Sequence, residues 1–163
     1  MKNSETFKLA ANGDREIVIS RAFDAPRKLV FDALTRPELL KQWLTGPPGW
    51  TMPICEIDLR VGGKFRYVWR GPDGTEMGMG GVYREIKPPE RLVGTEKFDE
   101  PWYPGEGLGK FELVEKDGRT IMTQTIQYES REARDVALKS PMEGGVRASY
   151  DTLEQLLALV EVR

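Results

Sequence analysis

The stretch SPMEGGVRASYDTLEQLLALV, residues 140–160, predicts one long amphipathic helix near the C-terminus. Its apolar residues recur every three or four positions and so share one helix face; they are Met142, Val146, Tyr150, Leu153, Leu157 and Val160. Ser140–Glu143 has the capping-box pattern, with Pro at the first helical position, that starts many helices. Gly144 and Gly145 each cost about 1 kcal/mol relative to Ala in a helix, so they indicate close backbone approach or spare volume beside its first turns.

The sequence ahead of this helix is typical of an antiparallel meander. Strand-like runs fall near residues 52–59, 64–70, 76–87, 91–99, 108–116 and 119–128. Asp117–Gly118 is a strong hairpin signal, and the connections are too short for helical crossovers. A further strand over 15–23 precedes two short helices, and the capping box Thr35–Glu38 is expected to open the second of them.

These elements predict an α+β fold in which a curved antiparallel sheet of about seven strands wraps around the C-terminal helix. The two short helices would close one end of the space between sheet and helix. At about 150 residues per domain, the 163 residues correspond to one domain. We expect it to span residues 15–163, with residues 1–14 as a mobile N-terminal segment.

Composition excludes several classes of function. The 24 Lys and Arg residues are scattered among 26 Asp and Glu, so no nucleic-acid partner is expected. The absence of His removes Ser-His-Asp and Cys-His catalysis and most zinc sites, so we expect no metal. Cys55 has no disulfide partner, and the chain shows neither a signal-peptide pattern nor about 20 consecutive apolar residues. The sequence therefore predicts a cytoplasmic protein without a membrane span.

Two glycine-rich runs, Gly78–Gly81 and Gly105–Gly109, invite comparison with phosphate-binding loops. Neither completes the dinucleotide-binding pattern, because Tyr83 and Lys110 stand where a further Gly is required. We therefore expect no nucleotide or other cofactor. Close packing under a curved strand explains the first run, and a mobile loop over a cavity mouth explains the second.

Several segments, in fixed order, resemble one protein family over roughly residues 15–160. They are Phe23–Pro26, Pro37–Leu40 with Trp43, Glu56–Gly63, Pro72–Gly74, Gly81–Ile86 and Pro89–Leu92. These segments are similar to homologues of the heat-shock-protein-90 ATPase activator C-terminal domain, within the START-like (SRPBCC) superfamily that includes the birch-pollen-allergen type. The resemblance implies a helix-grip fold that commonly holds an apolar small molecule between sheet and helix, where some members catalyse cyclisation or related chemistry.

The chain departs from this family at two points. Val146 follows Gly145 where many relatives have Trp, which reshapes a wall of the implied cavity. We also expect the chain to lack the additional N-terminal domain of the eukaryotic activator, so chaperone activation is not carried over.

Aromatic residues are the first candidates for ligand contact. Phe65, Tyr67 and Trp69 alternate and therefore share one face of a strand, which suits an aromatic-lined pocket; the alternative is that these side chains fill the core. One or two polar groups among Glu56, Arg66, Tyr67 and Tyr83 are expected to orient the ligand. The residues expected at the ligand-binding site are Trp43, Glu56, Phe65, Arg66, Tyr67, Trp69, Met79, Tyr83, Phe98, Trp102, Phe111 and Met122.

Glu56 and Asp58 share a strand face and are candidate acid–base groups, since a carboxylate against an apolar cavity has a raised pKa. Because the chain has no His, acid–base catalysis would fall to such a carboxylate, to Tyr or to bound water. Glu56 and Tyr83 are the candidate catalytic residues. The alternative is that the two carboxylates occupy an exposed face or pair with Arg66 or Arg70 across the hairpin.

We infer from these observations the binding or carriage of an apolar, aromatic or lipid-like small molecule between the sheet and the C-terminal helix. An alternative, which the sequence favours less, is a metal-independent cyclase, isomerase or hydrolase that uses a cavity carboxylate and Tyr. A further alternative is a protein-interaction module associated with a chaperone. Homodimer formation is left open.

Overall fold

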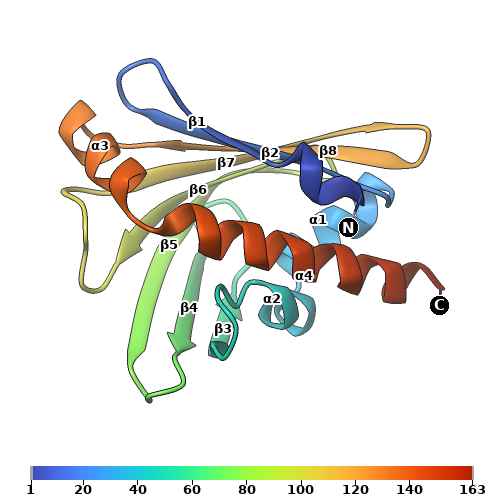
Figure 1. Cartoon of the computed structure of the whole chain (residues 1–163), viewed down its shortest axis with the longest axis horizontal. Helices are drawn as coiled ribbons and strands as arrows, with labels where there is room; N and C mark the ends of the chain where they lie inside the picture. Colours follow the sequence, from blue (N-terminus) through green and yellow to red (C-terminus); the bar gives the residue numbers. More distant parts are fainter. Residues whose placement is uncertain (1, 163) are drawn as a thin grey trace.

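A curved antiparallel sheet of eight strands partly surrounds one long helix in the computed structural model, which describes residues 2–162 (Figure 1). In chain order the elements are the 3-10 helix η1 (Lys2–Thr6), β1 (Lys8–Asn12), β2 (Glu16–Phe23), α1 (Arg27–Thr35), α2 (Pro37–Trp43), β3 (Thr51–Ile57), β4 (Lys64–Arg70), β5 (Glu76–Lys87), β6 (Arg91–Phe98), β7 (Gly107–Lys116), β8 (Arg119–Gln127), α3 (Arg131–Lys139) and α4 (Met142–Val162). The predicted helix-grip architecture is therefore confirmed. Within the described residues, no helix is long and apolar enough to cross a membrane.

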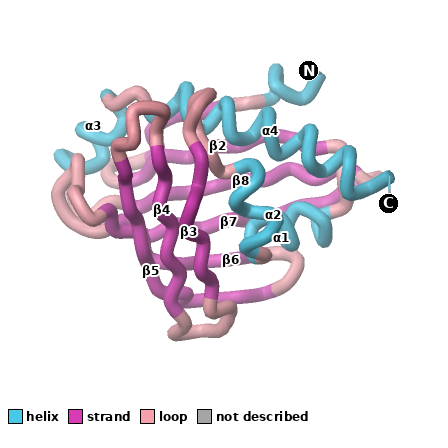
Figure 2. The backbone as a smooth tube through the Cα atoms, turned by 90° about the horizontal axis from the view of Figure 1, so that it is seen from below, coloured by secondary structure: helices cyan, strands magenta, loops and turns pink. Residues whose placement is uncertain are grey.

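The sheet follows the strand order β1-β2-β8-β7-β6-β5-β4-β3. Strands β3 to β8 form a meander, and β2 returns to pair with β8 from Glu16 opposite Gln127 to Phe23 opposite Thr120. Strands β3, β4 and β5 run across the direction of β2, β8, β7 and β6, so the sheet bends strongly (Figure 2). The pairing of β5 with β6 shifts register between Tyr83 and Glu85, and a bulge of this kind bends and twists a strand.

Glycines allow close packing in β5. A Cβ on Gly81 would overlap the carbonyl oxygen of Thr95 and lie 2.5 Å from Cζ of Phe65. This supports the packing explanation for the first glycine run. The second run departs from expectation, because Gly107 and Gly109 lie within β7 and not in a loop.

Two further expectations about the elements are corrected. The sheet has eight strands because residues 8–12, within the segment 1–14 expected to be mobile, form β1 and pair with β2. This edge strand is almost wholly exposed and carries no alternating apolar pattern. Thr35 does not cap the second short helix, since it ends α1 and its hydroxyl donates to the Phe31 carbonyl oxygen at 2.8 Å. The N-cap of α2 is Arg36, which makes no side-chain capping bond.

Helix α4 is fixed to the sheet in its second half. Leu153 of that half is fully buried. The buried Arg21 of β2 donates to Asp151 at 2.7 Å and to Glu154 at 3.1 Å. Asn3 donates to the same Glu154 at 2.6 Å. These bonds join the N-terminal segment, the sheet and the helix, and they leave the first half of α4 to cover a different part of the sheet.

Candidate functional site

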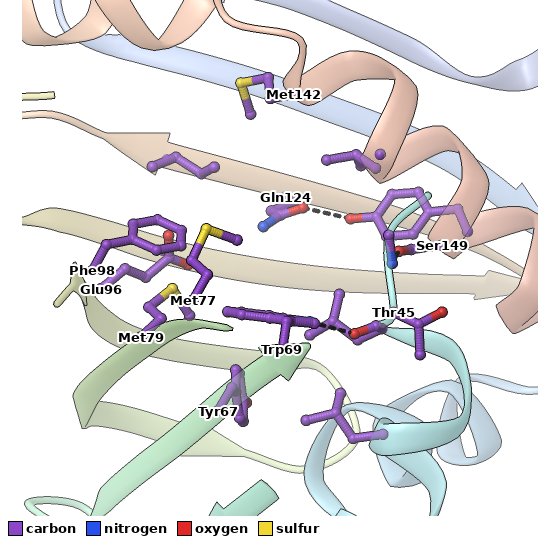
Figure 3. Close-up of a pocket in the computed structure, with 18 of the residues that line it drawn as sticks. Thr45, Tyr67, Trp69, Met77, Met79, Glu96, Phe98, Gln124, Met142 and Ser149 are labelled. Carbon is purple, nitrogen blue, oxygen red and sulfur yellow. Dashed lines mark hydrogen bonds between the residues drawn. The ribbon is translucent and has the colours of Figure 1, made fainter. Parts of the chain in front are cut away.

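A cavity of about 670 Å³ lies between the concave face of the sheet and the first half of α4 (Figure 3). Its walls come from strands β4 to β8, from α1, α2 and the loop that follows, and from α4. Twelve of the lining residues are aromatic, namely Trp43, Trp50, Phe65, Tyr67, Trp69, Tyr83, Phe98, Trp102, Tyr103, Phe111, Tyr128 and Tyr150.

Nine of the twelve residues predicted at the site line this cavity, and they are Trp43, Phe65, Tyr67, Trp69, Met79, Tyr83, Phe98, Trp102 and Phe111. Their rings contact one another: the Phe65 centroid lies 5.0 Å from that of Tyr67 and 5.1 Å from that of Tyr83. Six of the nine belong to the hydrophobic core, Phe98 and Phe111 pack against it, and Trp102 is exposed. Core packing and cavity lining are therefore combined in most of these residues.

Three predicted residues, Glu56, Arg66 and Met122, do not line the cavity. Arg66 lies between two inward rings on β4, so the alternation of strand side chains turns it outward, where it pairs with Asp99 through hydrogen bonds of 2.6 and 2.5 Å. Glu56 lies opposite Arg66 and is exposed, as is Asp58. Met122 is only 1% exposed and is covered by the core.

The structure therefore does not bring Glu56 and Tyr83 together at one site. Tyr83 lines the cavity, whereas Glu56 lies on the exposed face. The ion pairs expected across the hairpin do not form either, because Arg66 pairs with Asp99 and Arg70 pairs with Glu76. For Glu56, an exposed face is the correct reading.

Internal hydrogen bonds hold several polar groups of the cavity wall. Trp69 Nε1 donates to a backbone carbonyl oxygen just after α2 at 2.7 Å. The Tyr150 hydroxyl donates to Gln124 Oε1 at 2.5 Å, and Ser149 Oγ accepts from the Gly46 N–H at 2.9 Å. Two of these bonds are drawn as dashed lines in Figure 3. They fix the rings and tie α4 to the loop after α2, so the cavity is preorganised.

The hydroxyl of Tyr83 is buried and has no hydrogen-bond partner among the described residues. The neighbouring Tyr67 hydroxyl lowers the pKa of Tyr83 by less than burial raises it, but the contact between the two does not have the geometry of a full hydrogen bond. Burial raises the pKa of both hydroxyls above the usual range for Tyr, so both are neutral near pH 7. Because an unpaired buried hydroxyl costs free energy, Tyr83 is suited to bond a polar atom of a ligand.

Glu96 of β6 is the only charged residue among those that line the cavity. It makes no hydrogen bond or ion pair with any residue that the structure describes. Burial raises the pKa of its carboxyl from 4.5 to about 7. Near neutral pH this group therefore exists both as acid and as carboxylate, which suits proton exchange or the binding of a donor.

A glycine makes room for the Glu96 side chain. A Cβ on Gly109 of the neighbouring strand β7 would overlap Oε2 of Glu96 and lie 3.1 Å from its Cδ. Glu96 is not among the residues predicted from the sequence, although its signal was present: it stands two residues before Phe98 and therefore shares its strand face. Figure 3 shows the two side chains on the same side of the pocket.

The described residues give little support to catalysis by a cysteine nucleophile or to the binding of a metal ion. Burial raises the pKa of the Cys55 thiol to about 11, so the thiol is protonated near neutral pH and is a weak nucleophile. No group of three or more His, Cys, Asp or Glu side chains within residues 2–162 could hold a metal ion.

Comparisons with known proteins agree with the fold. The family model described as Activator of Hsp90 ATPase homolog 1-like protein matches residues 24–158. A solved structure from Rhodobacter sphaeroides is 32% identical with a TM-score of 0.88, and the match covers 94% of this chain and 98% of that one. A protein from Nitrosomonas europaea is 27% identical with a TM-score of 0.82, over 94% of this chain and 100% of that one. A search of curated proteins finds no significant match.

Proposed function

The chain belongs to the family of activator of Hsp90 ATPase homolog 1-like proteins, and from its cavity we propose that it binds an apolar small molecule between the sheet and α4. The observation that carries this proposal is the aromatic-walled cavity of about 670 Å³. Ligand sites in proteins commonly measure about 300–1,000 Å³ and are mostly apolar, with a few polar groups that fix orientation. This cavity has both properties.

The physical chemistry of the wall supports a ligand that is itself rich in apolar surface. Side chains that face an unfilled space lose dispersion contacts on that side. An apolar molecule that moves from water into the cavity restores these contacts. Aromatic rings add favourable edge-to-face and offset contacts with a flat ligand. The free Tyr83 hydroxyl and the Glu96 carboxyl are the polar groups that would orient it.

Filling the cavity tests this proposal. Val146 of α4 lines the cavity, and Val146→Trp would place a large ring in it. The matched control is Val114→Trp, because Val114 lies on β7 with 65% of its surface exposed. Binding is measured by calorimetry with 1-ethylnaphthalene as the probe, together with native mass spectrometry of the freshly purified protein.

We expect the parent and Val114→Trp to bind the probe or to retain a small molecule, and Val146→Trp to bind at least about tenfold more weakly. Equal binding by all three proteins would place the ligand elsewhere. No binding by the parent in either measurement would contradict the proposal.

Acid–base catalysis in the same cavity is a second candidate, favoured by the position of Glu96 and by its pKa of about 7. As a carboxylate, Glu96 would take a proton from a bound molecule and, as an acid, return it to another atom, which is what an isomerase requires. Glu96→Gln removes this exchange. If the parent isomerises a molecule that co-purifies with it, the parent and the variant should retain two different isomers. Native mass spectrometry detects the retained molecule, and chemical identification distinguishes the isomers; the same compound in both proteins would count against catalysis.

A further inference from the structure

The cavity holds a single formal charge, and that charge is negative. Among its lining residues Glu96 is the only Asp or Glu, and no Lys or Arg lines it. The Glu96 carboxylate has no ion-pair partner in the part of the chain that the structure describes. A carboxylate that is partly buried among aromatic rings and has no charged partner is poorly solvated, so a ligand cation would recover free energy, whereas a ligand anion would be repelled.

Aromatic rings surround the region of this carboxylate. The charge of Glu96 contributes to the raised pKa of Tyr103, Tyr128 and Tyr150, after the larger effect of burial, so these hydroxyls lie within its field. A Cβ on Gly107 would lie 3.5 Å from the Tyr103 hydroxyl oxygen and 3.8 Å from Cβ of Glu96. Tyr103 and Glu96 therefore flank the same glycine.

The rings on this side pack at steep angles to one another. The Tyr103 centroid lies 4.8 Å from that of Trp102 and 4.9 Å from that of Tyr128, with interplanar angles of 87° and 86°. Rings arranged in this way present both faces and edges to the space beside them. The face of an aromatic ring attracts a cation, and Trp and Tyr do so best. A carboxylate next to such rings is a chemical environment suited to an ammonium group.

The backbone is adapted to this carboxylate. Gly109 has no side chain where one would overlap Glu96 Oε2, and Gly94 lies directly opposite Gly109 on β6. Glycine in a strand interior weakens a sheet, and the space for Glu96 explains that cost at Gly109; at Gly94 a Cβ would instead contact Phe65, Val82 and Tyr83.

From these observations we propose that the ligand is an apolar, aromatic molecule carrying one basic nitrogen, whose ammonium group pairs with Glu96 while its hydrocarbon body fills the aromatic cavity. This inference rests on the proposed function. It adds the charge of the ligand and the residue that selects it.

Three probes with one hydrocarbon body and different charges test the inference. They are 1-naphthylmethylamine, which is a cation, 1-ethylnaphthalene, which is neutral, and 1-naphthaleneacetate, which is an anion. Their dissociation constants are measured by calorimetry at pH 7.5 with the full chain. A hydrogen bond to a charged group is stronger than one between neutral groups, so we expect the amine to bind at least about tenfold more tightly than the neutral probe, and the anion to bind most weakly.

Variants assign the selectivity to the carboxylate. Glu96→Gln keeps the size of the side chain and removes its charge. The dissociation constants of the amine and of the neutral probe should then differ by no more than about threefold. Gly109→Ala should reduce the same preference, because its methyl group displaces the Glu96 carboxyl. Glu56→Gln, at an exposed carboxylate outside the cavity, is the matched control and should keep the preference.

The outcomes separate this inference from the function on which it rests. If the neutral probe or the anion binds as tightly as the amine, the inference is wrong and the proposed function stands. If the amine is preferred and Glu96→Gln keeps that preference, another group recognises the nitrogen and the inference is also wrong. If no probe binds to the parent, the proposed function fails and the inference fails with it.

Discussion

Glu96 binds a proton in the folded protein over a pH range in which the unfolded chain has already released it. Its carboxyl pKa is about 7 in the fold against an ordinary value of 4.5, and burial is the cause. The stabilising contribution of this proton is complete below the unfolded pKa and is lost as the pH rises through the folded pKa. The tyrosines that share the cavity remain neutral throughout this range, and the described residues that line it include no Lys or Arg.

Glu96→Gln should therefore stabilise the protein at high pH and not at low pH. Above pH 7 the parent carries a carboxylate charge in the cavity that the variant lacks. The free energy of unfolding of the variant should therefore exceed that of the parent by roughly 2–4 kcal/mol. At pH 4 the difference should vanish, because the parent carboxyl is protonated there in the fold. Urea unfolding at several pH values measures this difference. Glu56→Gln is the control, and a stability difference for Glu96→Gln that does not change with pH would contradict the prediction.

At the scale of elements, α4 combines two kinds of contact. Its second half carries Leu153 and Leu157, which are buried, whereas its first half carries Gly145, which lines the cavity, and Gly144, which is exposed and does not. A Cβ on Gly144 would meet no atom within 4 Å, and one on Gly145 would lie 3.7 Å from Pro47 Cδ. Close backbone approach therefore does not require Gly144, and because this residue faces solvent outside the cavity, spare cavity volume does not require it either.

Gly144→Ala should stabilise the helix by about 1 kcal/mol, because Ala has the higher helix propensity and nothing obstructs its methyl group. Urea unfolding measures the gain. Gly81→Ala is the opposing control and should destabilise the protein, since its methyl group would overlap the Thr95 carbonyl oxygen. A loss of stability in Gly144→Ala would mean that the first turns of α4 need the freedom of glycine.

The sequence was informative where the signal is local. Alternation on β4 predicted that Phe65 and Tyr67 share a face, and the periodic apolar residues of α4 predicted its buried side. The strand β1 was missed because an exposed edge strand needs no apolar alternation. Glu96 shares the strand face of Phe98 and could have been predicted from that spacing, whereas its lack of a charged partner depends on how β6 pairs with β5 and β7, which is a property of distant segments.

At the scale of the whole molecule, the space between sheet and helix is filled at one end and hollow at the other. The filled end contains the buried Arg21, which bonds Asp151 and Glu154 of α4. Arg119 extends the network by donating to Asn3 at 2.6 Å. The hollow end is the aromatic cavity. The helix is therefore held firmly at the end away from the cavity, which leaves the cavity wall free of structural ion pairs.

Arg21→Met should destabilise the protein by about 2–4 kcal/mol, because it leaves two acidic groups of α4 without their buried partner. Thermal and urea unfolding measure the loss. Arg60→Met is the matched control, since Arg60 and its partner Asp58 are exposed and such pairs contribute little. Equal stability of Arg21→Met and the parent would show that apolar packing alone fixes the helix.

The pairing of β2 with β8 has a consequence for how the protein is made. During synthesis the N-terminal strand Glu16–Phe23 must wait until residue 127 has left the ribosome before it can complete its pairing. The aromatic concave face has no cover until α4 follows. An unfinished chain therefore exposes apolar surface that favours aggregation. A molecule that binds between sheet and helix can therefore recognise the chain only after α4 has been made and has packed on the sheet.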